Sequence, residues 1–518
     1  MKLAAITLAL IATVNAAENC SDYYNYALEP HGPFSGGVYN LSYMRPDPIC
    51  RTFNSSIVES TLDSVSQDIT DPDLRRLFSN AFPSTLDTAI KWKGYADGSD
   101  EELTFVITGD INAMWLRDSA NQMQSYLPLL TADDSSDSLA SLYRGVINLQ
   151  ARYLLLDPYC NSFQPPIESG VSPSPNPSAS EDTVFPNYTN TSVFECKYEL
   201  DSLAAFLEVS TDYYNATQDA TFFKKYSWVQ TIESILEVAE NMTVPTYQAD
   251  GNVSVLSYSF TRLTTRSSET TENDGLGNPF NNGTGLVRSF FRPSDDSTIF
   301  PGFIPANMMF SRFLETSAAI ADAIGEAGLC DRMTTMASNV RTAITNYGIV
   351  ETAGYGRVYA FEVDGYMGQN IMDDANIPSL LSAPFLGYLD VNDEVYQNTR
   401  KLLLSANNPY FMRGPQISAI GGAHDGPGYA WPMASIVRIL TSNDDEEITQ
   451  QLQEIVSTTD GLGLIHESIN TFNTSDWTRQ WFSWANGLFG QMILDLNDRK
   501  PGLLKQSFQG NESVGYSG

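Results

Sequence analysis

Apolar residues recur every three to four positions through most of the chain, which is the spacing of an amphipathic helix. The clearest runs lie at 139–153, 200–207, 229–239, 313–324 and 448–455. Alternating apolar and polar residues are confined to two short stretches, 257–263 and 357–366, which we expect to form hairpin strands between helices. Long Gly-, Pro- and Asp-rich connections separate the helical runs and hold the unusual residues. The pattern predicts a helical barrel whose functional site is built on loops.

One segment breaks this pattern, the Pro/Ser-rich stretch "PPIESGVSPSPNPSASED" at 165–182. Its composition cannot pack a core, so it is expected to be a surface loop or a partly disordered insertion. A length of 518 residues alone would suggest several domains, but single barrels also reach this size. No other composition change marks a boundary, and we expect residues 17–518 to form one catalytic domain.

Residues 1–16 have the pattern of a secretory signal peptide. Lys2 supplies the positive charge, a run of about a dozen apolar residues follows, and Val14-Asn15-Ala16 provides a small-residue cleavage site. Eleven N-x-S/T sequons follow, at Asn19, Asn40, Asn54, Asn187, Asn190, Asn215, Asn241, Asn252, Asn282, Asn473 and Asn511. We expect an N-glycosylated protein, secreted or held in the lumen of the secretory pathway, with no membrane-spanning segment.

Five cysteines in an oxidising compartment predict two disulfides and one free thiol. Among the possible pairings we expect Cys20–Cys50 and Cys160–Cys196, because the second would close the loop between its cysteines. Cys330 would then be free. The formal net charge of −33 repels a phosphate backbone, so nucleic acid is not an expected partner.

Several catalytic motifs are missing from the sequence. It contains no G-x-S-x-G nucleophile elbow, no P-loop and no dinucleotide-binding glycine motif. His466 and Glu467 begin an H-E-x-x-H zinc motif, but Asn470 stands where the second histidine would be. We therefore expect neither a metalloprotease nor a bound metal.

Polar and aromatic residues gather instead in loops at 108–130, 285–308, 372–381, 417–433 and 461–490, which contain five of the seven tryptophans. Carboxylates, Arg and Asn suit sugar hydroxyls, and aromatic rings suit the apolar face of a pyranose. Each loop also has an ordinary structural explanation: helix capping, Asx turns, or core tryptophans such as Trp477, Trp481 and Trp484, whose spacing fits one helical face. Their clustering favours a carbohydrate site.

Five stretches together carry a family resemblance: "TGDINAMWLRDSANQ", "RPSDDSTIFPGFIPANM", "FEVDGYMGQNIMDDANIPSLL", "IGGAHDGPGYAWPM" and "GLIHESIN…WTRQWFSWANGLFG". In this order, from about residue 84 to about residue 488, they resemble glycoside hydrolase family 125, the exo-α-1,6-mannosidases. The resemblance implies an all-α (α/α)6 barrel whose long loops and short hairpins form the active-site mouth. It also implies hydrolysis with inversion, no cofactor, and a mannose-containing oligosaccharide or polysaccharide as substrate. The insertion at 165–182 and the dense sequons depart from the family pattern.

By this resemblance Glu467 matches the general base, and the general acid is an aspartate of "RPSDD". Asp295 is our expected acid and Asp296 the alternative or a support. The residues expected to build the sugar pocket are Trp115, Arg117, Asp118, Glu199, Asp201, Asp373, Asp374, Asn376, His424, Trp431 and His466, with Asp201 a reserve candidate for a catalytic carboxyl. Burial and Asp296 are expected to raise the pKa of Asp295. Inversion requires the acid and base carboxyls to stand roughly 6.5–9.5 Å apart.

Two other functions stay open at this stage. An inverting helical-barrel glycosidase acting on α-glucosides would use the same kinds of residue. A secreted glycan-binding protein would keep the sugar pocket but has no need of an acid–base pair, which the chain retains. Cell-wall mannan, N-glycan and free oligosaccharide are all possible substrates, and the oligomeric state is open.

Overall fold

The computed structural model describes residues 20–509. The predicted signal peptide and the sequons at Asn19 and Asn511 lie outside the described residues. Within the described part, no helix is long and apolar enough to cross a membrane.

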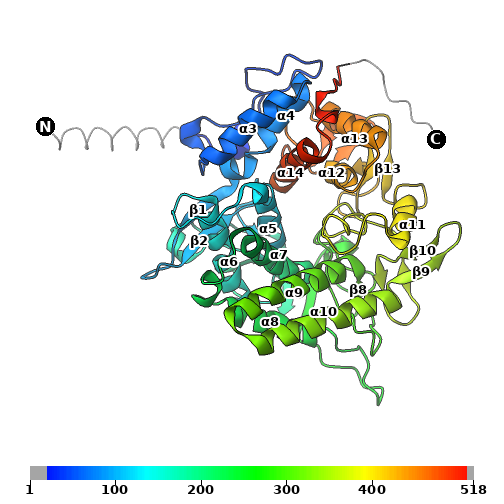
Figure 1. Cartoon of the computed structure of the whole chain (residues 1–518). Coiled ribbons are helices and arrows are strands. Elements are labelled where there is room, and N and C mark those ends of the chain that lie inside the picture. Colours follow the sequence, from blue (N-terminus) through cyan, green and yellow to red (C-terminus); the bar gives the residue numbers. More distant parts are fainter. Residues whose placement is uncertain (1–19, 510–518) are drawn as a thin grey trace.

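Helices arranged in a ring form the frame of the fold (Figure 1). The inner helices are α5 (Leu116–Gln124), α7 (Leu200–Thr217), α9 (Ile304–Ile324), α12 (Pro432–Leu440) and α14 (Ser483–Arg499). They pack in the order α12, α14, α5, α7, α9. The outer helices are α3 (Ser56–Asp68), α4 (Pro72–Ala81), α6 (Leu139–Leu156), α8 (Trp228–Asn241), α10 (Ala327–Tyr347), α11 (Glu394–Leu403) and α13 (Asp445–Ser457). This all-α arrangement is the expected (α/α)6 barrel.

The predicted apolar faces form its core. Leu142, Val146 and Leu149 of α6 are each at most 1% exposed, and the Leu, Ile, Val and Phe residues in the other helical runs are buried or partly buried. Burial of these faces is the main force holding the two rings of helices together.

Side-chain caps are found on four of the seven outer helices, whereas α3, α8 and α10 have none. Asp71, Ser138, Asp393 and Asp444 cap the outer helices α4, α6, α11 and α13, each accepting a backbone N–H in the first turn. None of the five inner helices has a side-chain cap. Their N-cap residues are Trp115, Glu199, Phe303, Trp431 and Phe482. Trp115, Trp431 and Phe482 line the cavity described below, and Glu199 pairs with Arg117 at its wall.

Short strands cover the end of the barrel where the inner helices begin. The three-stranded sheets are β3 (Met114–Trp115) with β4 (Ser162–Phe163) and β6 (Val193–Glu195); β8 (Gly302–Phe303) with β11 (Glu362–Val363) and β12 (Gln369–Asn370); and β15 (Tyr429–Ala430) with β16 (Ile469–Asn470) and β17 (Asn473–Trp477). Strands β3, β6, β8 and β15 lead into α5, α7, α9 and α12. Each sheet therefore fixes the residues at the start of an inner helix.

The remaining strands form two-stranded pairs: β1 (Ile90–Tyr95) with β2 (Glu102–Val106), β5 (Asp182–Phe185) with β7 (Ser259–Arg262), β9 (Ile349–Thr352) with β10 (Gly356–Tyr359), and β13 (Phe411–Arg413) with β14 (Ser418–Ile420). The expected hairpin at 257–263 is wrong, because β7 pairs with the distant β5. The stretch 357–366 divides between the β9–β10 hairpin and strand β11.

The Pro/Ser-rich segment is an ordered surface loop. It contains two short 3₁₀ turns, Ile167–Ser169 and Ser178–Glu181, and ends where β5 begins. The side chain of Gln164 makes two hydrogen bonds to the backbone of Ser174, both 2.9 Å long, and Arg152 pairs with Glu168. These contacts attach the loop to the barrel.

Both predicted disulfides are confirmed, Cys20–Cys50 and Cys160–Cys196, and Cys330 is free. The shared helical face predicted for Trp477, Trp481 and Trp484 is wrong. Trp477 ends β17, Trp481 lies in the following loop, and only Trp484 belongs to a helix, α14.

Candidate active site

A cavity of about 210 Å³ opens at the end of the barrel where the inner helices begin. Eight of the predicted site residues line it: Trp115, Arg117, Asp118, Asp295, Asn376, His424, Trp431 and Glu467. Seven further lining residues were not predicted as site residues: Thr108, Asp110, Ile111, Pro293, Ser294, Arg479 and Phe482. Segments separated by more than 350 residues in the sequence therefore meet around one small space.

Glu467 is held through both of its carboxylate oxygens. Thr478 Oγ1 donates to Oε2 at 3.0 Å, and Arg479 Nη1 donates to Oε1 at 3.2 Å. Arg479 also donates to both oxygens of Asp110, with Nε 3.0 Å from Oδ2. The guanidinium lies 4.7 Å from the ring centre of Phe482. Glu467, only 9% exposed, is thus fixed in orientation while bordering the cavity.

His466 lies outside the cavity lining. Its Nδ1–H donates to the backbone carbonyl of Arg479 at 2.9 Å, and its ring stacks on Trp477 with 4.7 Å between ring centres. Burial lowers the pKa of His466, which favours the neutral ring. The structure places this histidine behind Arg479, where it positions the loop that follows β17 and carries the arginine.

Asp295 projects into the cavity from a tight turn. Its φ of 63° lies in the left-handed region, which Asp tolerates better than most residues. The turn is closed by Arg292, which accepts a hydrogen bond from the Asp295 N–H at 2.9 Å and donates to the carbonyl of Asp296 at 2.8 Å. Oδ1 of Asp295 accepts from Asn161 Nδ2 at 2.7 Å and from Trp115 Nε1 at 3.4 Å.

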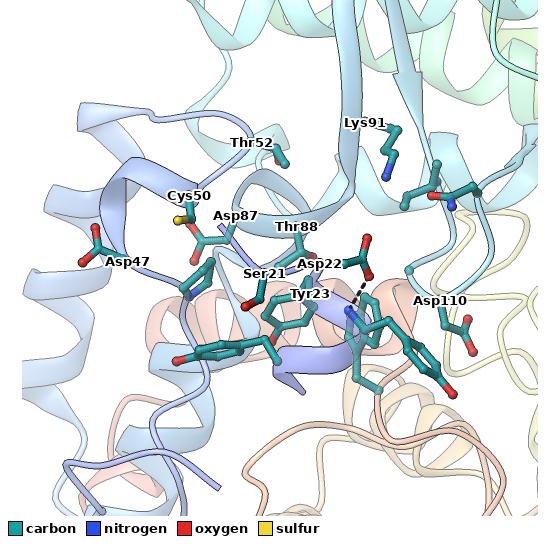
Figure 2. Close-up of a pocket in the computed structure, with 17 residues that line it drawn as sticks. Ser21, Asp22, Tyr23, Asp47, Cys50, Thr52, Asp87, Thr88, Lys91 and Asp110 are labelled. Carbon is teal, nitrogen blue, oxygen red and sulfur yellow. Dashed lines mark hydrogen bonds between the residues drawn. The ribbon is translucent and has the colours of Figure 1, made fainter. Parts of the chain in front are cut away.

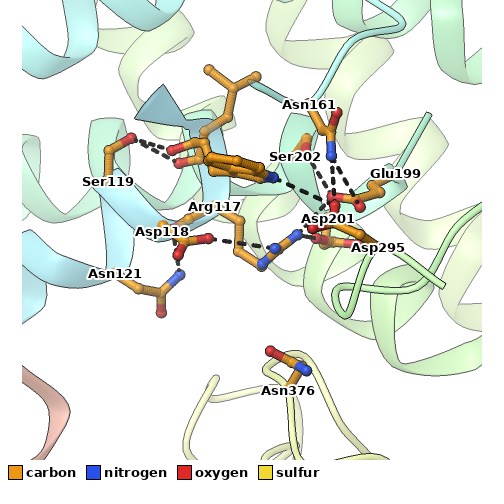
Figure 3. Close-up of polar contacts among 12 residues, drawn as sticks. Arg117, Asp118, Ser119, Asn121, Asn161, Glu199, Asp201, Ser202, Asp295 and Asn376 are labelled. Atoms are coloured by element: carbon orange, nitrogen blue, oxygen red, sulfur yellow. Dashed lines mark hydrogen bonds and ion pairs between the residues drawn. The ribbon is translucent and has the colours of Figure 1, made fainter. Parts of the chain in front are cut away.

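A buried ion network lies next to Asp295 (Figure 3). Arg117 Nη1 donates to Glu199 Oε2 at 2.6 Å and to Asp201 Oδ2 at 2.9 Å. Asn161 Nδ2, which donates to Asp295, is also 3.2 Å from Glu199 Oε1. Glu199 and Asp201 therefore do not line the cavity but support Arg117, which does. The Glu199 side chain also forms a hydrogen bond with Asp295.

The expected rise in the pKa of Asp295 is wrong. Burial acts to raise this pKa, but the charge of Lys197, the hydrogen bond with Glu199 and the charge of Arg117 outweigh burial and lower it. For Glu199, burial outweighs Arg117, and the nearby Asp295 charge raises its pKa further, well above the ordinary value. Glu199 and Asp295 therefore titrate as a pair, and burial together with their mutual repulsion favours a proton shared by the two carboxyls.

Asp296 does not line the cavity but pairs with His424, whose Nδ1 lies 3.5 Å from Asp296 Oδ2. Burial acts to lower the pKa of His424, but the hydrogen bond and charge of Asp296 raise it to about 9. The same pairing lowers the pKa of Asp296 despite its burial. Asp296 thus keeps a positively charged histidine at the cavity wall.

Asp118 faces both Asp295 and Glu467. Burial, opposed by Arg117 and reinforced by the charge of Asp295, raises the pKa of Asp118 to about 6. Because these carboxylates lie close together, the pKa of Asp118 depends on whether Asp295 and Glu467 are protonated.

Only one residue of the "MDDAN" stretch reaches the cavity. Asp373 accepts from the backbone N–H groups of Leu380 and Leu381 at 2.8 and 3.0 Å, which makes it a turn cap. Asp374 accepts from the backbone N–H of Asn376 at 3.1 Å, the Asx turn considered from the sequence. The Asn376 side chain lines the cavity, facing Arg117 and Asp118 across it (Figure 3).

Sequence reasoning missed the residues that hold the two carboxyls. Asp110, Thr478 and Arg479 lie in the stretches that carry the family resemblance, but their pairing across the chain has no local signal. Asn161 and Lys197 each follow a cysteine of the Cys160–Cys196 disulfide. That adjacency was the one available clue to their place beside the site.

Among residues 20–509, His, Cys, Asp and Glu side chains form no group of three or more suited to holding a metal ion. Of the carboxylates that line the cavity, Asp118 pairs with Arg117, and Asp110 and Glu467 pair with Arg479.

Comparison with known proteins gives the same family. The family model of metal-independent α-mannosidases (GH125) matches residues 71–494. The meiotically up-regulated gene 157 protein of Schizosaccharomyces pombe is 45% identical over 490 residues, 94% of each chain. A metal-independent α-mannosidase of Streptococcus pneumoniae, solved in a non-productive complex with α-1,6-mannobiose, is 32% identical with a TM-score of 0.75 over 87% of this chain and 100% of that chain. The chain therefore belongs to glycoside hydrolase family 125, the metal-independent α-mannosidases.

Proposed function

We propose that the protein is an exo-acting, inverting α-mannosidase that releases terminal α-1,6-linked mannose. The observation that carries this proposal is the pair of carboxyls, Asp295 and Glu467, which border one small cavity but are held by separate sets of donors. The α-1,6-mannobiose bound by the pneumococcal relative supports the choice of linkage.

Glu467 acts as the general base. It accepts a proton from a water molecule as the water oxygen attacks the anomeric carbon. Thr478 and Arg479 fix the plane of the carboxylate, and Asp110 fixes Arg479. The fixed carboxylate therefore directs the water to attack from the face of the sugar opposite the leaving oxygen.

Asp295 acts as the general acid, with its proton supplied by Glu199. A sugar covering Asp295 removes water from the carboxylate, and this desolvation raises the pKa of Asp295. The proton on Glu199 then moves along the hydrogen bond to Asp295 and on to the glycosidic oxygen as the C–O bond breaks. After product release, Glu467 loses its proton to solvent and the Glu199–Asp295 pair regains one.

The rest of the cavity suits a single sugar. Trp115, Trp431 and Phe482 offer aromatic faces, while Asp118 and Asn376 offer hydrogen bonds to hydroxyls. A space of about 210 Å³ favours one terminal residue over an internal segment of a polymer. This is the shape an exo-acting enzyme requires.

The test is hydrolysis of α-1,6-mannobiose followed by NMR of the first-formed sugar. Early β-mannose is the expected result, and early α-mannose would refute inversion. α-1,2- and α-1,3-Mannobiose and maltose test linkage and sugar. Faster turnover of maltose would favour the α-glucosidase alternative, and binding without turnover of any of them would favour a glycan-binding protein.

We also propose that the protein enters the secretory pathway and carries N-glycans. Of the nine sequons within residues 20–509, every asparagine except Asn241 is exposed, and the two disulfides suit an oxidising compartment. N-terminal sequencing of the native protein should begin at Ala17, and peptide-N-glycosidase should reduce its mass. A native chain that begins at Met1 and keeps its mass would contradict this proposal.

A further inference from the structure

A second, larger cavity lies outside the proposed mechanism (Figure 2). It measures about 360 Å³ and lies between the barrel and the N-terminal segment 20–52, which contains the short helix α2 (Tyr23–Tyr26) and is closed by the Cys20–Cys50 disulfide. We call it the N-terminal pocket. One wall of this pocket precedes residue 71, where the match to the family model begins. The pocket is therefore partly built by a segment outside that match.

The N-terminal pocket and the catalytic cavity share a wall. Asp110 lines both spaces, Gly109, Asn112 and Trp481 line the N-terminal pocket, and Arg479 lines the catalytic cavity. The Arg479–Asp110 ion pair therefore lies where the two spaces adjoin. A ligand large enough to occupy both spaces would contact residues 109–112 and 479–481 from either side.

Aromatic rings form a fixed surface in the N-terminal pocket. Tyr23 packs edge-on against Trp481 with 4.9 Å between ring centres, and its hydroxyl donates to the carbonyl of Met44 at 2.9 Å. Tyr24 is 43% exposed, and no residue of the described chain bonds to its hydroxyl. The packed rings of Tyr23 and Trp481, together with the exposed ring of Tyr24, are suited to the apolar face of a pyranose.

Polar groups in the pocket have unused hydrogen-bonding capacity. Within residues 20–509, Lys91 has no ion pair, and the side chains of Lys91 and Asn112 have no hydrogen bond, although both line the pocket. Asp22, which accepts from the backbone N–H of Tyr24 at 3.0 Å, and Asp47 add carboxylate acceptors. Figure 2 shows Asp22, Lys91 and Asp110 around the pocket.

These groups select a class of ligand. The carboxylates would repel a phosphate or an acidic ligand, and the free donors would be left unpaired by an apolar one. A neutral ligand with many hydroxyls and an apolar face satisfies both the donors and the rings.

We propose that the N-terminal pocket is an accessory carbohydrate-binding site, which holds further sugar units of an oligosaccharide whose terminal mannose lies in the catalytic cavity. Mannose as the sugar rests on the proposed function, whereas the carbohydrate class rests on the pocket's own side chains. The pocket does no chemistry. It increases the affinity for long substrates over short ones.

The first test measures binding in the full mature chain carrying Glu467→Gln, in which turnover is expected to be too slow to consume the ligand during the measurement. Hydroxyl-radical footprinting with a long α-1,6-manno-oligosaccharide should lower oxidation of Tyr24 severalfold. The protection should disappear when Lys91→Ala and Asn112→Ala are added, and should persist with Lys93→Ala, a matched loss of charge on the same strand outside the pocket. Unchanged oxidation of Tyr24, or equal protection in all variants, would overturn the proposal.

The second test is kinetic. Lys91→Ala and Tyr24→Ala should lower the ratio of kcat/KM for the long oligosaccharide to kcat/KM for α-1,6-mannobiose about 10-fold, the effect of losing one or two hydrogen bonds. An unchanged ratio would overturn the accessory site. Absence of mannoside hydrolysis in the wild-type chain would instead reject the proposed function, and footprinting would still report on the pocket.

Discussion

Arg479 joins Glu467 to Asp110, donating to Glu467 Oε1 at 3.2 Å and to Asp110 Oδ2 at 3.0 Å. The two carboxylates share one guanidinium, so the position of the Glu467 carboxylate depends on a residue 357 positions earlier in the chain (467 against 110). We expect Asp110→Asn to keep the shape of the site but loosen Arg479, lowering kcat about 10-fold with little change in KM for α-1,6-mannobiose. Steady-state kinetics measures both. A change confined to KM would show that Asp110 acts through ground-state binding instead.

Arg479→Lys should be more damaging than its conserved charge suggests. An ammonium cannot reproduce the planar fork that reaches both carboxylates, so we expect kcat to fall about 100-fold. The stability of the variant, followed by thermal unfolding, should stay close to wild type. Near-normal activity would show that charge alone, and not geometry, is what Glu467 requires from this residue.

Glu467→Gln removes the proton acceptor while keeping size and the hydrogen bond from Thr478. We expect kcat to fall by about 10²–10⁴-fold, the usual contribution of a general base, while binding of α-1,6-mannobiose measured by calorimetry remains. The control is Glu240→Gln, an exposed position at the end of α8, which should not change kcat. Residual turnover within 10-fold of wild type would reject Glu467 as the base.

Glu199 should determine the alkaline limit of activity. In the wild type, the Glu199–Asp295 pair keeps its proton to high pH because the pKa of Glu199 is raised. Glu199→Gln leaves the proton to Asp295 alone, whose pKa is lowered, so the alkaline limb of the kcat/KM profile should move to lower pH. Asp201→Asn, which also removes a carboxylate from Arg117, should leave the limb near its wild-type position. An alkaline limb that does not move in Glu199→Gln would refute the proton transfer.

The His424–Asp296 pair should stabilise the fold in a defined pH range. The folded pKa of His424, about 9, exceeds its unfolded value of 6.5, so its contribution is complete below pH 6.5 and is lost as pH rises through 9. The pKa of Asp296 is lowered, so its contribution is present above pH 3.8 and is lost as pH falls through the folded value. His424→Asn should therefore lower the free energy of unfolding by about 1 kcal/mol at pH 6, a value discounted for partial exposure, and by almost nothing at pH 10. Equal losses at both values would contradict the pairing.

Local patterns in the sequence were sufficient for the barrel. The apolar spacing of α6 and α13 needs only neighbouring residues, and both helices bury the expected faces. The same reasoning failed for Trp477, Trp481 and Trp484, because helical spacing does not reveal that strand β17 ends at Trp477.

The site was predictable where residue type determines the role and unpredictable where distant contacts determine it. Trp115, Arg117 and Glu467 line the cavity as expected. The lowered pKa of Asp295 depends on Lys197 and Glu199, which tertiary packing brings together from about a hundred residues away. Asp296 was expected to raise the pKa of Asp295, but its carboxylate pairs with His424 instead.

The uncapped starts of the inner helices explain why so many carboxylates surround one sugar. The N-cap residues of helices α5, α12 and α14 are Trp115, Trp431 and Phe482, which line the cavity, so the positive dipole ends of these helices converge on it. Cleavage of a glycosidic bond builds positive charge on the sugar ring, which such an environment disfavours. Asp118, Asp295 and Glu467 oppose that field with negative charge at the cavity wall. The helix ends alone would favour an anion, and under the proposed function these carboxylates favour the developing cation instead.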